Sequence, residues 1–498
     1  MSPKPKACVI GAGFAGLSAS THLARKGFDV TLVEKNDQAG GRARQFQKDG
    51  FVFDMGPSWY WMPDVFDRYF ELFGYQTSDL YKLVRLDPSY RVFFENEEVV
   101  DVPASMEELY ALFETRESGS SENLKRFLNE SAYKYQVGMQ DLVFKPGRSL
   151  MEFADSRVIG GLFRLQLLSS MSNYVRKFFK DPHLIRILEF PVLFLGATPQ
   201  DTPALYSLMN YADLSLGTWY PMGGMHKIVE GMVKVAENEG VNIQLNDEVT
   251  GFSFGAGNEI DKVITSRSGE IECDILVGGA DYHHIDQHLL PAHLRNYTSK
   301  YWDKRKMAPS SLLFYLGVNR RVPGLLHHNL FFDEDFGLHA HEIYNDPKWP
   351  SKPLFYVSCP SKTDASVAPE GQENLFLLIP VAPDLEDTPE MRERYFELVM
   401  DRLEARTATP IREHIVYKRS YAHNDFKSDY HAFKGNAYGL ANTLSQTAIL
   451  KPSLKSKKIQ NLYFTGQLTT PGPGVPPSLI SGEVVSGEVV KDLKMNVL

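Results

Sequence analysis

Residues 6–34 read KACVIGAGFAGLSASTHLARKGFDVTLVE, and this stretch decides the fold. Its apolar run over Lys6–Ile10 predicts a short buried strand, the segment Phe14–Arg25 predicts a helix with small residues on one side, and residues 28–34 predict a second strand. A strand, a helix and a strand in so few residues form a βαβ unit, in which the two strands run parallel. We therefore expect this region to open a Rossmann-type sheet.

Three glycines occupy the predicted turn between the first strand and the helix. Gly11 permits a tight turn, Gly13 lets the backbone approach a pyrophosphate, and Gly16 allows the helix to lie close to the strand. The N-terminus of the helix then faces the phosphate charge. Glu34 closes the second strand about 20 residues further on, where a carboxylate accepts hydrogen bonds from ribose hydroxyls and argues against the 2′-phosphate of NADP. These residues predict a dinucleotide site.

Two further segments favour FAD over NAD as the dinucleotide. Residues 40–43, GGRA, follow the second strand, and a glycine pair with an Arg brings backbone N–H groups and a cation to the same diphosphate. Residues 461–482 read NLYFTGQLTTPGPGVPPSLISG, which predicts a strand, a Pro/Gly turn and the start of a helix. Helix-terminal N–H groups there suit the ribityl and isoalloxazine end of FAD. An ordinary Pro-rich surface loop is the alternative interpretation.

A second nucleotide site is not expected. Gly255 and Gly257 resemble the start of another dinucleotide loop, but a third glycine is missing and predicted strands flank the pair. A hairpin turn explains both glycines. A built-in NAD(P)H reductase is therefore disfavoured, and a quinone or oxygen is the expected electron acceptor.

The rest of the chain divides into helical and β-rich blocks. Helical spacing dominates residues 105–209. Strands are expected over residues 241–245, 248–254, 262–266, 275–277, 310–318, 354–359, 374–379 and 459–466, and a last helix over about 478–493. The predicted class is α/β: a Rossmann-type FAD-binding domain assembled from both chain ends (1–90, 217–290, 455–498), an inserted helical layer (103–216) that faces the membrane, and a mixed-sheet substrate-binding domain (91–102, 291–454).

Composition limits the class of protein. Apolar residues make up 43% and charged residues 23% of the chain, as in a folded globular protein. The net charge of −9 argues against a nucleic-acid partner. Three distant cysteines exclude a disulfide framework and favour a reducing, cytoplasmic compartment. The N-terminus lacks the pattern of a secretory signal, and the strongest apolar run, residues 187–197, is too short to span a membrane.

Five stretches carry a resemblance to a known family. They are VIGAGFAGLSAS (9–20), VTLVEKNDQAGGRA (30–43), DGFVFDMGPSWYWMP (49–63), WYPMGGMHKIVEGM (219–232) and NLYFTGQLTTPGPGVPPSLISG (461–482). Together, and in this order, they resemble the bacterial-type carotenoid desaturases, specifically the phytoene desaturases that lead to lycopene. The resemblance implies FAD, a long C40 polyene substrate and peripheral attachment to the inner face of the cell membrane.

The resemblance also implies flavin contacts from both ends of the chain. With their neighbours in the same loops, the predicted cofactor-binding residues are Gly11, Gly13, Phe14, Ala15, Gly16, Glu34, Lys35, Gly40, Gly41, Arg42, Gly56, Pro57, Ser58, Asp281, Gly466, Gln467, Gly474, Val475 and Pro476. Asp281 is followed by His283 and His284, a grouping that also admits a metal site. Flavin hydride chemistry needs no metal, so none is expected.

Desaturation removes a hydride from one carbon and a proton from the next, so a catalytic triad is not expected. Asp155 and Arg157 fall near an acidic–basic pair proposed for relatives, and they are candidates for handling the proton. Glu189 is a third candidate, because burial in its apolar surroundings raises the pKa of a carboxylate. Solvated charges at a helix start, for the first two, and a satisfied structural carboxylate, for Glu189, are the alternatives.

Aromatic and basic residues indicate where an apolar substrate enters. Trp59, Tyr60, Trp61, Trp219 and Tyr220 flank the predicted flavin segments, and apolar walls suit a polyene tunnel, with ordinary core packing as the alternative. Residues 162–179 mix Phe and Leu with Arg and Lys and suit a lipid headgroup layer. A helix packed on the core is the other interpretation of that stretch.

The main hypothesis is FAD-dependent desaturation of a long-chain carotenoid, phytoene towards lycopene, by hydride transfer to flavin N5 and loss of an adjacent proton. The alternatives inside the family are a hydroxycarotenoid desaturase, a C30 desaturase and a flavin-dependent isomerase. From other classes, a non-catalytic protein that binds flavin and carotenoid and a flavin amine oxidase remain open.

Overall fold

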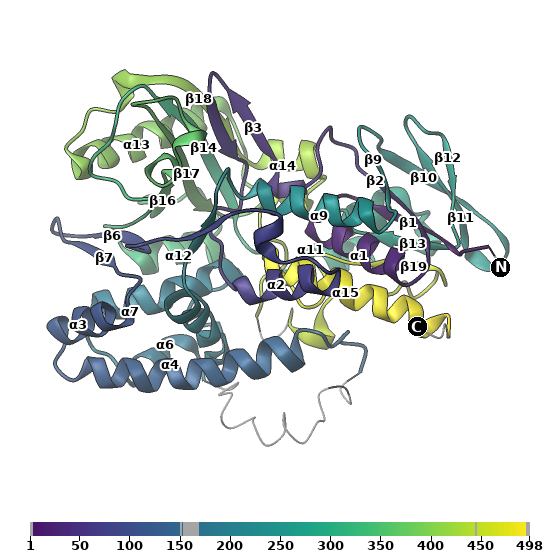
Figure 1. Cartoon of the computed structure of the whole chain (residues 1–498), viewed down its shortest axis with the longest axis horizontal. Coiled ribbons are helices and arrows are strands. Elements are labelled where there is room, and N and C mark those ends of the chain that lie inside the picture. The colour runs from purple at the N-terminus through teal and green to yellow at the C-terminus, as the bar shows by residue number, and fades with distance from the viewer. Residues whose placement is uncertain (1–2, 150–151, 153–168, 444–445, 495–498) are drawn as a thin grey trace.

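A five-stranded parallel sheet is completed by three distant parts of the chain (Figure 1). The computed structural model describes residues 3–149, 152, 169–443 and 446–494. The strand order is β19-β13-β1-β2-β9, with β1 (Lys6–Ile10), β2 (Asp29–Val33), β9 (Asn242–Gln244), β13 (Ile275–Gly278) and β19 (Leu462–Phe464). The predicted Rossmann-type sheet is confirmed, with β1 in its centre.

Helices α1 (Phe14–Arg25), α9 (His226–Asn238) and α15 (Val475–Asp492) accompany this sheet. α15 packs directly on α1, so the two ends of the chain lie side by side. Gly482 permits this contact, because a Cβ there would lie 2.5 Å from the backbone oxygen of Ala15 and 2.6 Å from the backbone nitrogen of Ala19. The small residues of α1 thus serve helix packing as well as the turn before it.

An antiparallel three-stranded sheet stands beside the Rossmann sheet. It contains β10 (Val249–Phe254), β11 (Ile260–Thr265) and β12 (Glu270–Glu272). Gly257, at φ 74°, lies in the turn between β10 and β11. The prediction of a hairpin at this position is therefore confirmed.

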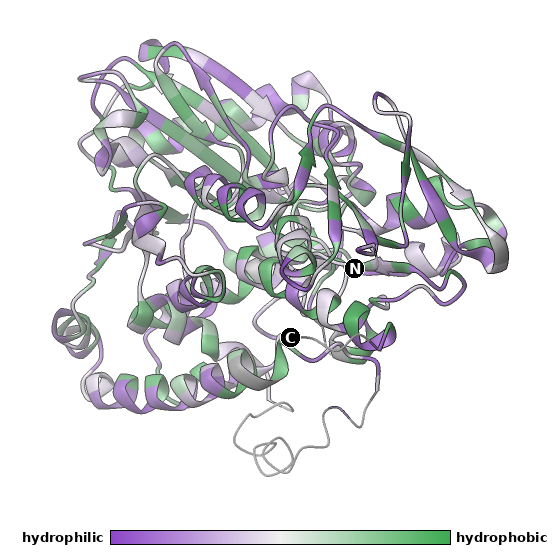
Figure 2. Cartoon of the chain, turned by 45° about the vertical axis from the view of Figure 1, so that its right-hand side comes forward, coloured by the Kyte–Doolittle hydropathy of each residue, from purple (hydrophilic) through white to green (hydrophobic). Residues whose placement is uncertain are grey.

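A seven-stranded mixed sheet forms the second large layer. Its order is β18-β14-β17-β16-β15-β6-β7, with β6 (Tyr90–Phe94), β7 (Val99–Val102), β14 (Ser310–Val318), β15 (His328–Phe332), β16 (Phe355–Ser358), β17 (Glu373–Val381) and β18 (Ile415–Tyr421). Every residue of β14 is buried, and Figure 2 shows the central strands as mostly apolar. Helix α13 (Pro389–Thr407) contributes Phe396, Val399 and Leu403 to the core on one face of this sheet.

A layer of helices lies below the two sheets in Figure 1. It contains α3 (Met106–Arg116), α4 (Ser120–Val137), α6 (Met171–Val175), α7 (Pro182–Glu189) and α8 (Leu208–Asn210). The remaining helices are α2 (Pro63–Leu72), α10 (Tyr282–His284), α11 (Ser299–Asp303), α12 (Phe336–Tyr344) and α14 (His423–Tyr430). Two short sheets, β3 (Gln45–Lys48) with β4 (Phe51–Asp54) and β5 (Leu83–Arg85) with β8 (Trp219–Pro221), connect the layers.

The structure differs from the sequence expectation mainly at the ends of elements. The strand expected over 459–466 spans only Leu462–Phe464, because Gly466, at φ 103°, already belongs to a turn. The last helix begins at Val475 rather than near residue 478, since Pro476 and Pro477 fit the first turn of a helix. Of the stretch 162–179, residues 162–168 lie outside the described part, whereas Phe179 is buried in the core.

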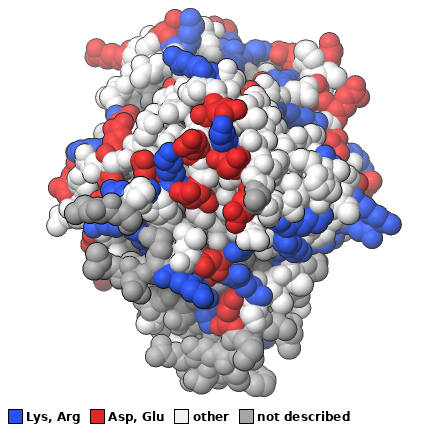
Figure 3. Space-filling model, turned by 90° about the vertical axis from the view of Figure 1, so that its right-hand side faces the viewer, with Lys and Arg blue, Asp and Glu red and all other residues white. Residues whose placement is uncertain are grey.

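Charges of both signs occupy the surface. On the face shown in Figure 3, acidic and basic side chains are interspersed. Among the described residues, no helix is long and apolar enough to cross a bilayer.

Candidate functional site

One large cavity, of about 460 Å³, is lined by all three parts of the fold. We name its two regions by their wall residues. The dinucleotide branch is the region lined by Gly11, Gly13, Glu34, Gly41, Arg42, Asp281, His284, His431, Gly466 and Val475. The apolar branch is lined by Trp59, Trp61, Phe66, Phe190, Leu330, Phe332, Phe336, Ala340, Ile343, Tyr344, Tyr356 and Tyr438.

The predicted cofactor-binding residues gather around this cavity although they are far apart in sequence. All of them except Gly16 line it. Gly16 instead lies beneath the turn, where an added Cβ would be 1.8 Å from the backbone oxygen of Gly11. Its contribution is the close approach of α1 to the turn, as its place in the motif predicts. That these residues contact FAD stays a prediction.

The glycine turn forms an open cradle. Gly11 takes φ +91°, a conformation that side chains with a Cβ rarely adopt. A Cβ on Gly13 would meet nothing within 4 Å among the described residues, so its position faces open space. Gly41, at φ +55°, lies directly across the turn, where an added Cβ would be 3.3 Å from the Cα of Gly13. The backbone is thereby accessible to a bulky anion at the start of α1.

Glu34 is fixed at the end of β2 by backbone donors. The Ala12 N–H donates to Oε2 at 2.8 Å, and the Asn36 N–H donates to Oε1 at 2.9 Å. The side chain is 5% exposed and lines the cavity. The Asn36 side-chain amide Nδ2 also donates to Oε1, at 2.7 Å. The remaining acceptor capacity for a ribose hydroxyl therefore lies on Oε2, which has one donor.

Arg42 supplies positive charge from the opposite side. Its Nε is buried and has no hydrogen-bond partner among the described residues. Nη2 donates to the Asn436 carbonyl oxygen at 3.1 Å, and the Gln467 amide oxygen, in its satisfied orientation, accepts from both terminal nitrogens at 3.0 and 3.2 Å. Burial lowers the pKa of Arg42. A guanidinium with an unused donor beside an open glycine cradle fits a diphosphate.

Asp281 caps the N-terminus of α10. Its negative charge raises the pKa of Arg42 and so partly offsets the effect of burial. Its Oδ1 accepts from the His284 N–H at 3.1 Å, and its Oδ2 accepts from the Phe433 N–H at 3.2 Å. Burial raises the pKa of Asp281 to about 6, and the two backbone donors and Arg42 limit this rise. A buried carboxylate at this place suits hydroxyls of a polar ligand rather than a second anion.

The C-terminal half of the site is built on the start of α15. Gly466 follows β19, and Gly474, at φ 109°, precedes the helix. Two of the first three helical residues are Pro476 and Pro477, which carry no N–H. Val475 alone among these three therefore offers a free N–H to a ligand. The expected set of helix-terminal donors is smaller than the sequence prediction assumed.

The sequence analysis did not predict that two histidines, His284 and His431, meet in the dinucleotide branch. The rings of His284 and His431 stack at 3.8 Å with 5° between their planes. The Glu248 Oε1 lies 2.7 Å from His431 Nε2. Burial lowers the pKa of His284 to about 3. The three residues come from separate segments, so no local spacing in the sequence indicates that they meet.

The predicted catalytic residues are not gathered at the cavity. Asp155 and Arg157 lie outside the described residues. Glu189 is buried as expected, but its Oε1 pairs with Arg176 and it does not line the cavity. Its neighbour Phe190 does. The satisfied structural carboxylate therefore describes Glu189 better than a group that faces a substrate.

Of the aromatic residues predicted to line a substrate tunnel, some line the cavity and others do not. Trp59 and Trp61 line the cavity. Tyr60 does not, because it is buried with its hydroxyl 2.9 Å from that of Tyr81. Trp219 and Tyr220 are also absent from the wall of the large cavity. Alternation along the chain turns neighbouring side chains in opposite directions, which sequence proximity to a flavin motif does not reveal.

Both histidines that follow Asp281 stack on aromatic rings. His283 stacks on Phe433 at 3.9 Å, and His284 stacks on His431. Within the described residues, no group of three or more His, Cys, Asp or Glu side chains is arranged to hold a metal ion.

Helix α12 forms one wall of the apolar branch. Phe336, His339, Ala340, Ile343 and Tyr344 follow the spacing of one helical face, and all five line the cavity. His339 carries no charge at neutral pH, because burial lowers its pKa to about 4. Both of its ring nitrogens have partners: Nε2 lies 2.9 Å from the Pro380 carbonyl oxygen, and Nδ1 accepts from the Leu354 N–H at 3.0 Å. Among the described wall residues of this branch, none is Asp, Glu, Lys or Arg.

Comparisons with known proteins identify the family of this chain. The family model of the flavin-containing amine oxidoreductases matches residues 14–490. The chain is 42% identical to the carotenoid 3,4-desaturase of Haloarcula japonica, over 97% of this chain and 98% of that protein. It is 32% identical to the zeta-carotene-forming phytoene desaturase of Myxococcus xanthus, over 96% of this chain and 92% of that protein.

Solved structures share the fold at low sequence identity. An oxidoreductase from Methanosarcina mazei has a TM-score of 0.64 at 14% identity and covers 97% of this chain and 100% of its own. A triple mutant of putrescine oxidase with redesigned cofactor binding has a TM-score of 0.60 at 13% identity, over 98% of this chain and 99% of its own.

The fold and the cavity define an FAD-dependent oxidoreductase. The chain belongs to the flavin-containing amine oxidoreductase family and, within it, to the carotenoid desaturases. The predicted family resemblance and the predicted cofactor are thereby confirmed.

Proposed function

We propose that this protein desaturates a carotenoid at a CH–CH bond with FAD as the hydride acceptor. The observation that carries the proposal is the single cavity that joins the dinucleotide branch to an apolar branch without charged wall residues among those described. Bound FAD supplies the acceptor for the hydride that leaves the substrate carbon. An amine cation finds no carboxylate in the apolar branch, which favours a polyene over the amine substrates of other family members.

The chain's own residues bind and orient the substrate. Trp59 and Trp61 and the apolar face of α12 form the walls that exclude water from the polyene. Arg42, the glycine cradle and Glu34 hold the dinucleotide at the other end of the same cavity. The protein thus contributes positioning, which is the main requirement when the cofactor performs the difficult step.

Two bonds are candidates for desaturation. The 42% identity to the Haloarcula japonica carotenoid 3,4-desaturase, over nearly the whole of both chains, favours the 3,4 bond of a carotenoid that is already conjugated. Phytoene desaturation towards lycopene, the sequence prediction, is the second candidate, and the 32% identical phytoene desaturase of Myxococcus xanthus supports it. A quinone or oxygen is the proposed final electron acceptor, and the protein is proposed to act in the cytoplasm at the inner membrane surface.

The test supplies FAD-loaded protein with liposomes that contain either phytoene or lycopene, together with a quinone. Lycopene converted to a 3,4-desaturated product, with phytoene intact, supports the first candidate. Conversion of phytoene to longer conjugated polyenes supports the second. Flavin that no carotenoid reduces would instead indicate a non-catalytic binding protein, and rapid flavin bleaching by amines would indicate an amine oxidase.

A further inference from the structure

The apolar branch has a polar spot next to the dinucleotide branch. Tyr356 on β16 lines the apolar branch, and Ser58 lies beside its phenol. Ser58 directly follows Gly56 and Pro57, which are predicted flavin contacts and line the same cavity. The Tyr356 hydroxyl therefore lies near the place where a bound polyene meets the cofactor.

A buried histidine, His328, contacts this phenol. His328 Nδ1 is 2.6 Å from the Tyr356 hydroxyl oxygen. The imidazole is fully buried and stacks on Trp59 at 4.1 Å with 12° between the ring planes. Burial lowers the pKa of His328 well below its usual range, so the ring is neutral. In the tautomer that carries its hydrogen on Nε2, the Nδ1 lone pair accepts the hydrogen bond from the phenol.

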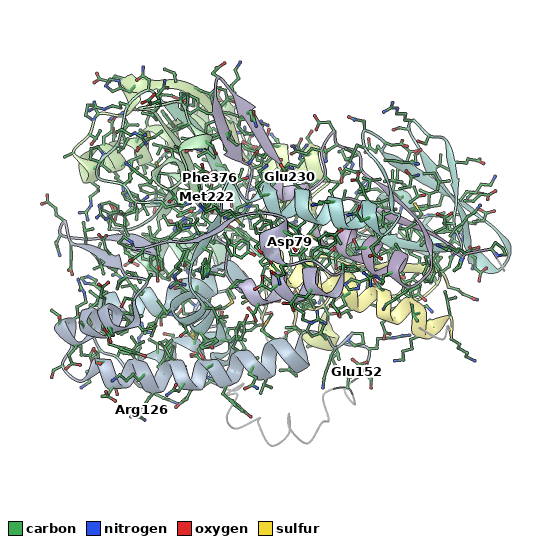
Figure 4. All side chains as sticks on the ribbon, in the orientation of Figure 1. Asp79, Arg126, Glu152, Met222, Glu230 and Phe376 are labelled. Atoms are coloured by element: carbon green, nitrogen blue, oxygen red, sulfur yellow. The ribbon has the colours of Figure 1, made fainter. Side chains whose placement is uncertain are left out.

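A second, small cavity lies next to this spot. It has a volume of about 20 Å³, enough for one water molecule, and it shares Ser58 with the large cavity. Three of its wall atoms, Tyr220 Oη, His327 Nε2 and Ser358 Oγ, are buried without a hydrogen-bond partner among the described residues. Phe376, labelled in Figure 4, closes the cavity on the side of the seven-stranded sheet.

The small cavity leads out through His327. Its Nδ1 is 2.7 Å from the Thr363 hydroxyl oxygen, and Thr363 is partly exposed. Ser358 lies beside Tyr356 on the inner side. A water in the small cavity would form hydrogen bonds with the three unpartnered wall atoms. It would thereby connect Ser358, beside Tyr356, to His327 and Thr363 in one polar path.

We propose that Tyr356, backed by His328, accepts the proton that the carotenoid loses, and that this proton leaves through the small cavity, His327 and Thr363. The inference rests on the proposed function. The substrate loses a hydride to the oxidised flavin from one carbon and a proton to Tyr356 Oη from the next, and the C–H electrons left behind form the new double bond. As Oη takes that proton, the phenolic proton moves to His328 Nδ1. Oη then gives the substrate proton to the small cavity and takes the phenolic proton back from His328, which restores both residues.

Other polar groups on the apolar wall do not offer this arrangement. Both ring nitrogens of His339 already have partners. Tyr438 lines the same branch and lies beside Ser311 rather than beside an imidazole. Tyr395 on α13 serves as the control, because its buried hydroxyl donates to the Pro350 carbonyl oxygen and the residue lines neither cavity.

The first test measures the rate of flavin reduction by the carotenoid in a single anaerobic turnover. Tyr356→Phe is expected to lower this rate by about 10²-fold or more, the usual effect of removing a general base, and to leave the FAD content unchanged. Tyr395→Phe is expected to stay within a few-fold of the parent. A Tyr356→Phe protein that reduces its flavin at the parent rate, or an equal loss in both variants, would overturn the proposal.

A second readout separates a chemical role from a structural one. With substrate deuterated at the carbon that loses the proton, Tyr356→Phe should show a larger isotope effect than the parent, because proton loss becomes rate-limiting. An unchanged isotope effect contradicts the assignment. If Tyr356→Phe fails to retain FAD, His328→Gln provides the same test, since the amide accepts the Tyr356 hydrogen bond but takes up no proton at neutral pH.

The exit path has a test that does not depend on turnover. A high-resolution crystal structure is expected to show one water between Tyr220, His327 and Ser358, and an empty small cavity would remove the path. If parent flavin is reduced by no carotenoid, the proposed function fails and this inference fails with it. If the parent reacts and Tyr356→Phe reacts equally fast, only the proton acceptor is wrong.

Discussion

The two branches of the large cavity are built by different means. The dinucleotide branch depends on backbone conformation: positive φ at Gly11 and Gly41, open space at Gly13 and N–H donors that fix Glu34. The apolar branch depends on side chains from α12, the seven-stranded sheet and the segment around Trp59. Backbone requirements leave short motifs in a sequence, whereas a wall of apolar side chains does not. Each of the following experiments acts on one branch, and the last also tests whether the other branch is spared.

The largest effect is expected at Gly16, in the turn that supports the dinucleotide branch. Gly16→Ala forces a Cβ to within 1.8 Å of the Gly11 backbone oxygen, so the turn or α1 must shift. We expect a loss of about 4 kcal/mol in the free energy of unfolding, together with loss of bound FAD. Chemical denaturation and the flavin-to-protein absorbance ratio measure both. Gly487→Ala is the control, because no described atom lies within 4 Å of its added Cβ; equal stability of the two variants would contradict the packing argument.

Asp281 makes the stability of the FAD-free protein depend on pH. Its pKa is raised to about 6 in the folded state, so between about pH 4 and pH 6 the folded carboxyl holds a proton that the unfolded one releases. The contribution of Asp281 therefore stabilises the fold at low pH and is lost as the pH rises through 6, by at most about 3 kcal/mol. The free energy of unfolding, measured in urea at pH 4 and at pH 7, should differ less in Asp281→Asn than in the parent by this amount. Asp303→Asn, at an exposed position, should leave the profile unchanged; matching profiles for parent and Asp281→Asn would refute the raised pKa.

Glu34 tests ribose recognition in the dinucleotide branch. Glu34→Gln keeps the size of the side chain but replaces a charged hydrogen-bond acceptor by an amide. Since hydrogen bonds to a charged group contribute about 1.5–3 kcal/mol, we expect FAD to bind at least tenfold more weakly. Titration of the apo-protein with FAD, followed by flavin fluorescence, measures this. Exposed Glu237→Gln on α9 serves as the control, and unchanged affinity in Glu34→Gln would remove this residue from the site.

The smallest effect is expected in the apolar branch. Ala340→Phe places a ring on the cavity face of α12 and should lower kcat/KM for the carotenoid about tenfold, because it narrows the space for the polyene. FAD affinity should not change, since Ala340 belongs to the other branch. Leu338→Phe, on the exposed side of the same helix, is the matched control. A fall in FAD affinity with Ala340→Phe would show that the two branches are not independent.

The sequence predicted those parts of the site that local rules control. The βαβ opening, the hairpin at Gly257 and the helix after Gly474 appear where turn and helix signals placed them. Nearly all predicted cofactor-binding residues line one cavity, and those that follow β1, β2, β13 and β19 lie at the carboxyl ends of parallel strands. Their role as flavin contacts remains a prediction that the Glu34 and Gly16 variants address.

Contacts between distant segments were beyond the same reasoning. The pairing of Glu189 with Arg176, the His284–His431 stack and the inward position of Trp59 but not Tyr60 all depend on which elements meet in space. Burial alone does not tell whether a carboxylate faces a ligand or an arginine. For that reason the proton-handling residues were the weakest part of the sequence prediction.

The sequence by itself determined the cofactor and the family, because glycine spacing, Glu34 and the segment 461–482 reflect backbone requirements that few folds share. Only the tertiary structure decided which side chains form the apolar branch and which polar groups stand at its edge. His328 and Tyr356 meet because β15 and β16 pair in the seven-stranded sheet, and Ser58 reaches them from the segment that follows β4. Local backbone conformation is set by neighbouring residues, whereas the walls of a cavity are set by packing over the whole chain.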